Sequence, residues 1–184
     1  SSNRFMMRLT ITGPRSVGKS AVAETLARMF KVDYISPGLL YQRPSNNGNG
    51  APYSRVNLIY ENNRIGFVLD LPGELINSRE YPGASSRLML NAKQNSVVVG
   101  LLPSGAPKRA IDFLCRKEAQ KPKFRGAPRK DILAKIVEDY DGLPSLLKDF
   151  CNIVVYVIDK SPDEIAEEIV CRYHGKSQKD KQNA

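Results

Sequence analysis

Short apolar runs alternate along the chain with segments whose apolar residues are spaced for one face of a helix. The apolar runs are rich in β-branched residues, and each ends near Gly, Pro, Asp or Ser, which is typical of strands. We predict strands over residues 7–12, 32–35, 65–69, 97–102 and 153–158. Three of these runs are nearly all apolar, and this favours a parallel sheet covered on both faces.

Helical spacing is clearest over residues 19–30, where Val22, Leu26, Met29 and Phe30 share one face. The same spacing predicts further helices over 84–93, 107–119, 131–140, 144–150 and 161–173. The last of these begins with Ser161-Pro162-Asp163-Glu164, which is the pattern of a capping box with proline in the first turn.

Other segments carry weaker signals. Residues 53–63 are ambiguous between strand and helix, and 37–41 are compatible with a short helix. Residues 43–52 and 120–130 are loops by their Asn, Gly and Pro content. The chain ends on a polar segment that we expect to be a disordered tail.

The alternation of strands and helices predicts an α/β doubly wound domain: a parallel sheet of about five strands with helices on both faces, in three α/β/α layers. A length of 184 residues fits one domain. We assign residues 1–175 to that domain and 176–184 to the polar tail.

Composition excludes several classes of protein. With 41% hydrophobic and 26% charged residues, the chain is neither wholly disordered nor collagen-like, and no apolar run reaches the roughly 18–20 residues of a spanning helix. The three cysteines are far apart and form no CxxC pair, so we expect no zinc site or disulfide framework and a reducing, cytoplasmic location. A single histidine, His174, excludes an HExxH metalloprotease.

The formal net charge of +9 is unevenly distributed. Residues 104–130 hold nine basic and two acidic side chains, whereas residues 131–170 hold three basic and ten acidic ones. A short basic segment beside an acidic one indicates a local anionic ligand. Because only Phe124 is aromatic within 120–130, we do not expect a nucleic-acid partner.

Residues 13–20 read GPRSVGKS, the complete GxxxxGK[ST] pattern between a predicted strand and a predicted helix. Glycines let the backbone curl around phosphate, and the N–H groups at the helix start point at negative charge. The lysine reaches the β and γ phosphates, and the serine hydroxyl is placed for Mg²⁺. The predicted nucleotide-binding residues are Gly13, Pro14, Arg15, Ser16, Val17, Gly18, Lys19 and Ser20. The alternative is a glycine-rich turn with a solvated lysine.

A carboxylate at the carboxyl edge of the sheet is expected to hold Mg²⁺ through water. Asp70 ends the apolar strand 65–69 and is our first candidate, with Ser20 as the direct ligand. Glu74 ranks lower, and Asp33, Asp112 and Asp159 remain open as alternatives.

Asp70-Leu71-Pro72-Gly73 also matches the DxxG pattern of regulatory GTPases. Such a switch needs a threonine between the phosphate loop and DxxG, and residues 26–69 contain none. No NKxD-type guanine motif follows a later strand either, so a GTPase is disfavoured.

The motifs together resemble the nucleoside monophosphate kinases, adenylate and cytidylate kinase especially. The resemblance is carried by GPRSVGKSAVAETLARMF, KVDYISPGLLYQR, GFVLD, PRKDILAKIVEDYDGLPSLLKDF and IVVYVIDKSPDEIAEEIV. It implies a kinase that moves the γ-phosphoryl group of ATP, with Mg²⁺, to a nucleoside monophosphate, AMP first. It also implies a monomer whose partners are these nucleotides, without a membrane partner.

The resemblance assigns roles by position. Lys19 would be catalytic together with the lid or post-lid arginines Arg116, Arg125 and Arg129, and 104–130 would be a basic lid. Residues 38–64 would be a shortened acceptor-binding segment, in which Gly38 and Arg43 contact the acceptor.

The family's DGFPR signature reads Asp70-Leu71-Pro72-Gly73-Glu74 in this chain, so that Glu74 replaces an arginine. Arg79 and Arg87 are the candidates to substitute for it, and we name Arg79 first. This departure leaves two alternatives open: a non-catalytic or weakly active ATP-binding module, and a P-loop kinase of a small metabolite.

Overall fold

Five parallel strands form one sheet in the computed structural model, which describes residues 7–36, 51–62, 65–121 and 129–182. The strand order is β2-β3-β1-β4-β5. The bounds are β1 Arg8–Gly13, β2 Asp33–Ile35, β3 Phe67–Pro72, β4 Val97–Leu102 and β5 Ile153–Tyr156. This confirms the predicted α/β fold with a parallel five-stranded sheet.

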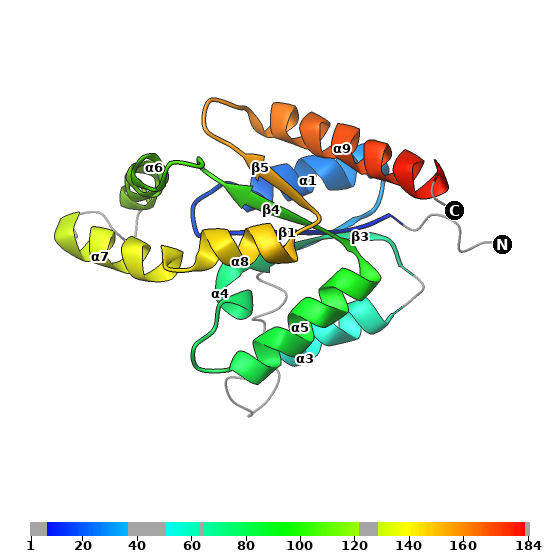
Figure 1. Ribbon diagram of the computed structural model, residues 1–184, viewed down its shortest axis with the longest axis horizontal. Helices are drawn as coiled ribbons and strands as arrows, with labels where there is room; N and C mark the ends of the chain where they lie inside the picture. Colours follow the sequence, from blue (N-terminus) through cyan, green and yellow to red (C-terminus); the bar gives the residue numbers. More distant parts are fainter. Residues whose placement is uncertain (1–6, 37–50, 63–64, 122–128, 183–184) are drawn as a thin grey trace.

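Helices cover both faces of the sheet (Figure 1). Helices α1 (Lys19–Phe30) and α9 (Pro162–Gln182) pack together on one face. Helices α3 (Ala51–Glu61), α5 (Pro82–Asn95) and α8 (Leu143–Phe150) lie on the other, with the short α4 (Gly73–Ile76). Helices α6 (Pro107–Ala119) and α7 (Arg129–Tyr140) lie together beyond the carboxyl ends of the strands.

The central strands place the candidate site by their register. On β1, Ile11 lies opposite Asp70 of β3 and Val99 of β4, and Gly13 lies opposite Pro72. Because the strands are parallel, the segments that leave β1, β3 and β4 emerge at one edge. This is the edge at which ligands bind in open α/β sheets.

Several predicted elements agree closely with the structure, and others differ. The helices predicted over 19–30 and 107–119 and the strand over 97–102 have the observed bounds. Residues 53–61 of the ambiguous segment belong to α3, which buries Tyr53, Val56 and Tyr60 on one face. The helix α4 was not predicted, and the possible helix over 37–41 lies outside the described residues.

The prediction of a disordered tail is wrong for most of that segment, because α9 continues to Gln182. Residues 174–182 contain one glycine and no proline, and after the glycine they are mainly Lys, Gln, Ser and Asp. A polar composition does not stop a helix that is already nucleated, since extending it costs far less than starting it.

The three cysteines are free thiols. Cys151 is buried, and burial raises the pKa of its thiol to about 12. It packs so closely on β4 that a Cβ at Gly100 would lie 2.9 Å from its Sγ. Cys151 therefore acts as a small core residue, whereas Cys171 is exposed. Among the described residues, no helix combines the length and apolar character required to traverse a bilayer.

Arg8, at the start of β1, ties together the ends of several elements. Its guanidinium donates to the carbonyl oxygens of Ile59, Tyr60 and Asn62 at the end of α3, of Ile65 before β3, and of Asn95 at the end of α5. The same group lies 4.8 Å from the centre of the Phe67 ring. Terminal helix carbonyls have no partner within their own helix, so one cation satisfies the ends of two helices.

Replacing Arg8 with Met should therefore leave the hydrophobic stem in place and remove these donors. Hydrogen bonds to charged groups contribute about 1.5–3 kcal/mol each, but some of these carbonyls would regain water. We expect Arg8→Met to lower the free energy of unfolding in urea by about 2–4 kcal/mol. The exposed Arg87→Met on α5 is the control. An equal effect of the two variants would contradict the role assigned to Arg8.

Candidate phosphate-binding site

The loop between β1 and α1 has the conformation needed to surround an anion. Gly18 has φ 101° and is the residue directly before α1, so the left-handed turn there suits glycine. The backbone N–H of Val17 donates to Pro14 O at 3.4 Å and closes the loop. The N–H groups at the start of α1 are consequently directed at the space above the loop, where a phosphate would lie.

Three backbone segments are in van der Waals contact at the base of this loop. A Cβ added to Gly13 would lie 2.4 Å from Leu101 O of β4, and one added to Gly73 would lie 2.5 Å from Gly13 O. Both positions therefore require glycine. Gly73 of the DLPG sequence is explained by this contact, without any switch function.

The side chain of Lys19 lies over the loop. Its Nζ donates to Pro14 O at 3.0 Å. Burial lowers the pKa of Lys19 to about 8, with Lys121 and Arg15 adding to the effect and Asp70 and Glu74 opposing it. A phosphate chain would offer this ammonium a stronger partner than a carbonyl oxygen.

Asp70 forms the acidic side of the site. Its Oδ2 accepts hydrogen bonds from Ser20 Oγ at 2.8 Å and from Tyr34 at 3.3 Å. Its other oxygen, Oδ1, is buried and has no hydrogen-bond partner among the described residues. Burial raises the pKa of Asp70, against the hydrogen bond from Ser20, the charge of Lys19 and the hydrogen bond from Tyr34. The structure thus brings together the two residues predicted to hold Mg²⁺.

A second buried carboxylate contacts the loop from α6. The Glu118 side chain is only 2% exposed, and it accepts a hydrogen bond from Ser16 Oγ. Lys121 Nζ lies 3.0 Å from Glu118 Oε2, and Arg15 Nη2 lies 3.6 Å from Oε1. Two residues of the predicted nucleotide site are therefore held by a helix almost a hundred residues further along the chain.

A cavity of about 600 Å³ opens beside the loop. Its walls are the start of α1, one face of α6 and the loop that follows β5. On the α6 wall, Lys117 Nζ lies 5.6 Å from the centre of the Phe113 ring. The lining residues are Ser16, Val17, Gly18, Ala21, Val22, Phe113, Lys117, Val157, Asp159, Lys160, Ser161, Pro162 and Ile165. The volume lies in the range of small-molecule sites.

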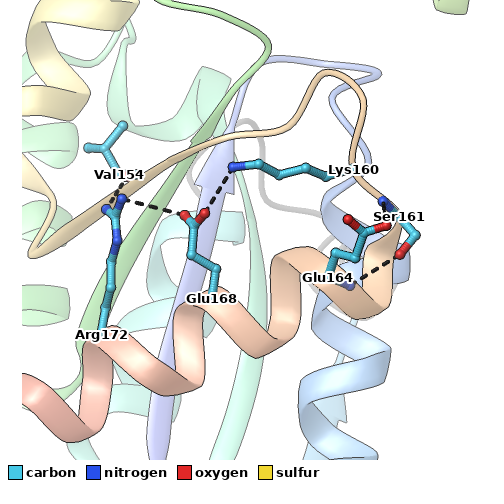
Figure 2. Close-up of polar contacts among 6 residues, drawn as sticks. All are labelled: Val154, Lys160, Ser161, Glu164, Glu168 and Arg172. Atoms are coloured by element: carbon cyan, nitrogen blue, oxygen red, sulfur yellow. Dashed lines mark hydrogen bonds and ion pairs between the residues drawn. The ribbon is translucent and has the colours of Figure 1, made fainter.

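The loop after β5 is fixed by the start of α9 (Figure 2). Ser161 Oγ accepts from the Glu164 N–H at 3.1 Å, and the Glu164 carboxylate accepts from the Ser161 N–H at 3.3 Å. This confirms the predicted capping box. Lys160 pairs with Glu168 of α9 at 2.9 Å, so the far wall of the cavity is attached to the helix beneath it.

The structure describes only some of the predicted site arginines. Arg116 lies exposed on α6, next to the cavity residue Lys117. Arg129 is the first residue of α7. Arg125, Gly38 and Arg43 lie outside the described residues, so their roles stay predictions.

Arg79 lies at a different place. It pairs with Asp141 at 2.7 Å, and both side chains are largely exposed. The pair lines a second cavity of about 640 Å³, between α6, α7, α8 and the end of β5. In the structure the partner of Arg79 is therefore a carboxylate, and its contact with an acceptor stays a prediction.

Sequence reasoning missed two residues of the site, Tyr34 and Glu118. Tyr34 lies on the predicted strand 32–35. Glu118 is one of only two acidic residues in the basic segment 104–130. An isolated acidic residue in such a segment was the available signal, but its burial could not be deduced from the sequence.

Searches with the sequence find no matching family model and no matching curated protein. Searches with the structure find chains of the same fold. A shikimate kinase from Acinetobacter baumannii in complex with shikimate has a TM-score of 0.66 at 14% identity, over 95% of this chain and 97% of that one.

Two further solved structures have the same fold. The YorR protein from Bacillus subtilis, in complex with phosphorylated GDP, has a TM-score of 0.62 at 20% identity, over 92% of this chain and 98% of that one. A gluconokinase from Sinorhizobium meliloti has a TM-score of 0.54 at 16% identity, over 90% of each chain. The fold of this chain is thus that of small P-loop kinases.

The contact at Gly73 is testable by mutation. Gly73→Ala would force the Cβ against Gly13 O and displace the phosphate loop, so we expect a loss of about 1–3 kcal/mol in the free energy of unfolding and weaker ATP binding. Gly83→Ala on α5 is the control, because no atom lies within 4 Å of its added Cβ. Full stability and ATP affinity in Gly73→Ala would refute the contact.

Asp70 is testable through the metal dependence of binding. Mg²⁺ should raise the affinity of the wild type for ATP, measured by calorimetry. In Asp70→Asn, we expect this increase to be at least about tenfold smaller, since the amide carries no charge for the cation. In EDTA, the affinity should be unchanged or higher, because one negative charge near the phosphates is removed. The exposed Asp112→Asn on α6 should behave as wild type. An unchanged Mg²⁺ enhancement in Asp70→Asn would remove Asp70 from the metal site.

Proposed function

We propose that the protein is an ATP-dependent phosphotransferase that moves the γ-phosphoryl group of ATP to a small acceptor. The observation that carries the proposal is that the phosphate loop and the cavity of about 600 Å³ share Ser16, Val17 and Gly18. One ligand with a flat ring at one end and a chain of phosphates at the other would occupy both. A nucleoside triphosphate has this shape.

The base would enter the cavity between α6 and the loop after β5. Phe113 offers an aromatic surface there, and Lys117 and Lys160 line the same space. Four of the five backbone N–H groups in loop 157–161 already donate within the protein, so the carbonyl oxygens of this loop are the groups that would hydrogen-bond the edge of a base. The capping box of α9 keeps this loop in place.

The phosphates would lie on the loop itself. The N–H groups at the start of α1 would bind the oxygens, and Lys19 would exchange its contact with Pro14 O for the β and γ phosphates. Phosphoryl transfer depends mainly on positioning and on stabilising charge, so it requires neither histidine nor a protein nucleophile.

The residues present fit a magnesium ion. Ser20 supplies a hydroxyl and Asp70 a carboxylate within 2.8 Å of each other, and the buried Oδ1 of Asp70 lacks a hydrogen-bond partner among the described residues. When bound, Mg²⁺ would shield the charge of the phosphates. Ser20 and Asp70 would orient it, and Tyr34 would orient Asp70.

In the reaction, an oxygen of the acceptor attacks the γ-phosphorus while the bond to the β–γ bridging oxygen breaks. ADP leaves with the bond's electron pair, and any proton on the acceptor oxygen passes to solvent or a nearby base. The lid arginines Arg116, Arg125 and Arg129 are our candidates for binding the charge that spreads over the transferred group. Gly38, Arg43 and Arg79 are the candidates for the acceptor.

As acceptor we propose a nucleoside monophosphate, AMP first. The support is the resemblance around the phosphate loop and in GFVLD, together with the fold shared with YorR in complex with phosphorylated GDP. The two nucleotides would then meet at the carboxyl ends of β1 and β3.

A second candidate acceptor is a small hydroxylated metabolite. The observation that favours it is Glu74, a carboxylate close enough to Lys19 and to Asp139 of α7 to act on both electrostatically. In the proposed arrangement, Glu74 would face the acceptor. A negative charge there repels a phosphate-bearing acceptor more than it repels a hydroxyl. The fold is also that of a shikimate kinase and a gluconokinase.

The test is a panel of acceptors incubated with Mg²⁺·ATP, with products separated by chromatography. It includes each nucleoside monophosphate, shikimate, gluconate and related polyols. We expect one acceptor to give its phosphorylated product and ADP in equal amounts. Lys19→Ala should reduce turnover at least about a thousandfold, since it removes the main cation on the transferred group.

Glu74→Arg distinguishes the two acceptor classes. It should raise kcat/KM for a monophosphate acceptor and lower or leave unchanged that for a neutral hydroxyl compound. ATP binding without turnover on any acceptor would instead support the non-catalytic ATP-binding module. Absence of ATP binding would refute both.

A further inference from the structure

Ser16 occupies a strained position in the phosphate loop. Its φ is +67°, in the left-handed region that glycine adopts freely and that L-residues with a side chain disfavour. The neighbouring loop positions with positive φ, Gly13 and Gly18, are both glycines. The loop therefore uses serine where glycine would be the ordinary choice, and something must compensate.

The compensating contact comes from α6. Ser16 Oγ donates to Glu118 Oε2, and the Glu118 side chain is 2% exposed. A hydrogen bond to a buried carboxylate stabilises the structure more than one to an exposed carboxylate, because water cannot replace the donor. Glycine at position 16 would adopt the same backbone but could not make this bond.

Glu118 also meets two cations, Lys121 on one oxygen and Arg15 on the other. Burial by itself raises the pKa of the Glu118 carboxyl group. The pKa is nevertheless lowered, because the hydrogen bonds from Ser16 and Lys121 and the charges of Lys121 and Arg15 together outweigh burial. The carboxylate is therefore charged at neutral pH, which a strong acceptor requires.

From these contacts we infer that Glu118 is a positioning residue for the phosphate loop: its carboxylate holds Ser16 in the left-handed conformation and so keeps the loop N–H groups directed at a phosphate. The role in phosphate binding rests on the proposed function, whereas the conformational role does not. The proposal assigns Glu118 an effect on the loop through Ser16 and no contact of its own with the nucleotide's phosphates.

This role makes an unusual prediction for Ser16. At an ordinary position, Ser→Gly is more damaging than Ser→Ala, because glycine has more freedom to lose. Here the order should reverse. Ser16→Ala keeps the strain and loses the bond, whereas Ser16→Gly removes the strain together with the bond.

The experiment is a double-mutant cycle of Glu118→Met and Ser16→Gly, with Ser16→Ala beside it. The first readout is hydrogen exchange of the amides of residues 16–20 without nucleotide. The second is the affinity for Mg²⁺·ATP, measured by calorimetry. Glu118→Met preserves most of the side-chain volume and removes the acceptor.

In the chain with Ser16, we expect Glu118→Met to speed exchange and to weaken ATP binding, each by about tenfold, the range of one hydrogen bond to a charged group. In the Ser16→Gly background the same change should alter each by less than about threefold. Ser16→Ala should resemble Glu118→Met, and Ser16→Gly should change both readouts less than Ser16→Ala does. In active protein, the loss should appear in KM for ATP more than in kcat.

Glu167→Gln, an exposed glutamate of α9, is the matched control and should change neither readout. Glu118→Gln keeps an amide oxygen as acceptor and should give an intermediate effect. If Glu118→Met does not fold, the cycle with Glu118→Gln decides the question.

An equal effect of the Glu118 substitutions with and without Ser16→Gly would overturn the proposal, because Glu118 would then act only through the packing of α6. No effect in either background would also overturn it. If the wild type binds no ATP, the proposed function fails, while the exchange of residues 16–20 still decides the role of Glu118.

Discussion

The site depends on the contact of three backbone segments at one edge of the sheet. Gly13 leaves β1, Gly73 leaves β3, and Leu101 belongs to β4, and neither glycine has room for a Cβ. The parallel register sets these segments side by side, and the missing side chains let them touch. The phosphate loop is thereby fixed by backbone on two sides, before any side chain contributes. Asp70, three residues before Gly73, lies opposite Ile11 and comes within hydrogen-bond distance of Ser20 for the same reason.

The electrostatics of the site follow from that fixed loop. Each cation around it lies near a carboxylate: Lys19 near Asp70 and Glu74, and Arg15 near Glu118. Lys121, from the basic segment 104–130, pairs with the same Glu118. A polyphosphate would compete with Pro14 O for Lys19. This arrangement lets the protein keep its cations charged and in place without a nucleotide.

Much of the fold and half of the site follow from short-range patterns. The apolar runs and the helical spacing predicted all five strands to within a few residues, because burial on both faces leaves little choice of residue. The motif GPRSVGKS and Asp70 could be recognised in the sequence, because the geometry of the loop and the need for a negative charge allow few residue types at these positions. Tyr34 and Glu118 could not be found in this way. Each acts through a contact between distant segments, Tyr34 with Asp70 and Glu118 with Ser16, and no local pattern records which polar residue will be buried against which.

In the proposed function, the site has two halves, one that binds the phosphate donor and one that binds the acceptor. The contacts that a local pattern predicts belong mainly to the donor half. The donor half is made of backbone: the loop, the start of α1, and the loop after β5 that α9 holds. Such a half would tolerate wide changes of sequence, and the fold itself is shared with a shikimate kinase at 14% identity and a gluconokinase at 16% identity. The proposed acceptor half would depend on side chains, so single substitutions would change its charge. Glu74 stands where the DGFPR signature has arginine, and with Asp139 nearby it would make the proposed acceptor edge more acidic. The charge of the acceptor, more than the identity of the donor, is therefore the property in which this protein would differ from the nucleoside monophosphate kinases that its loop resembles.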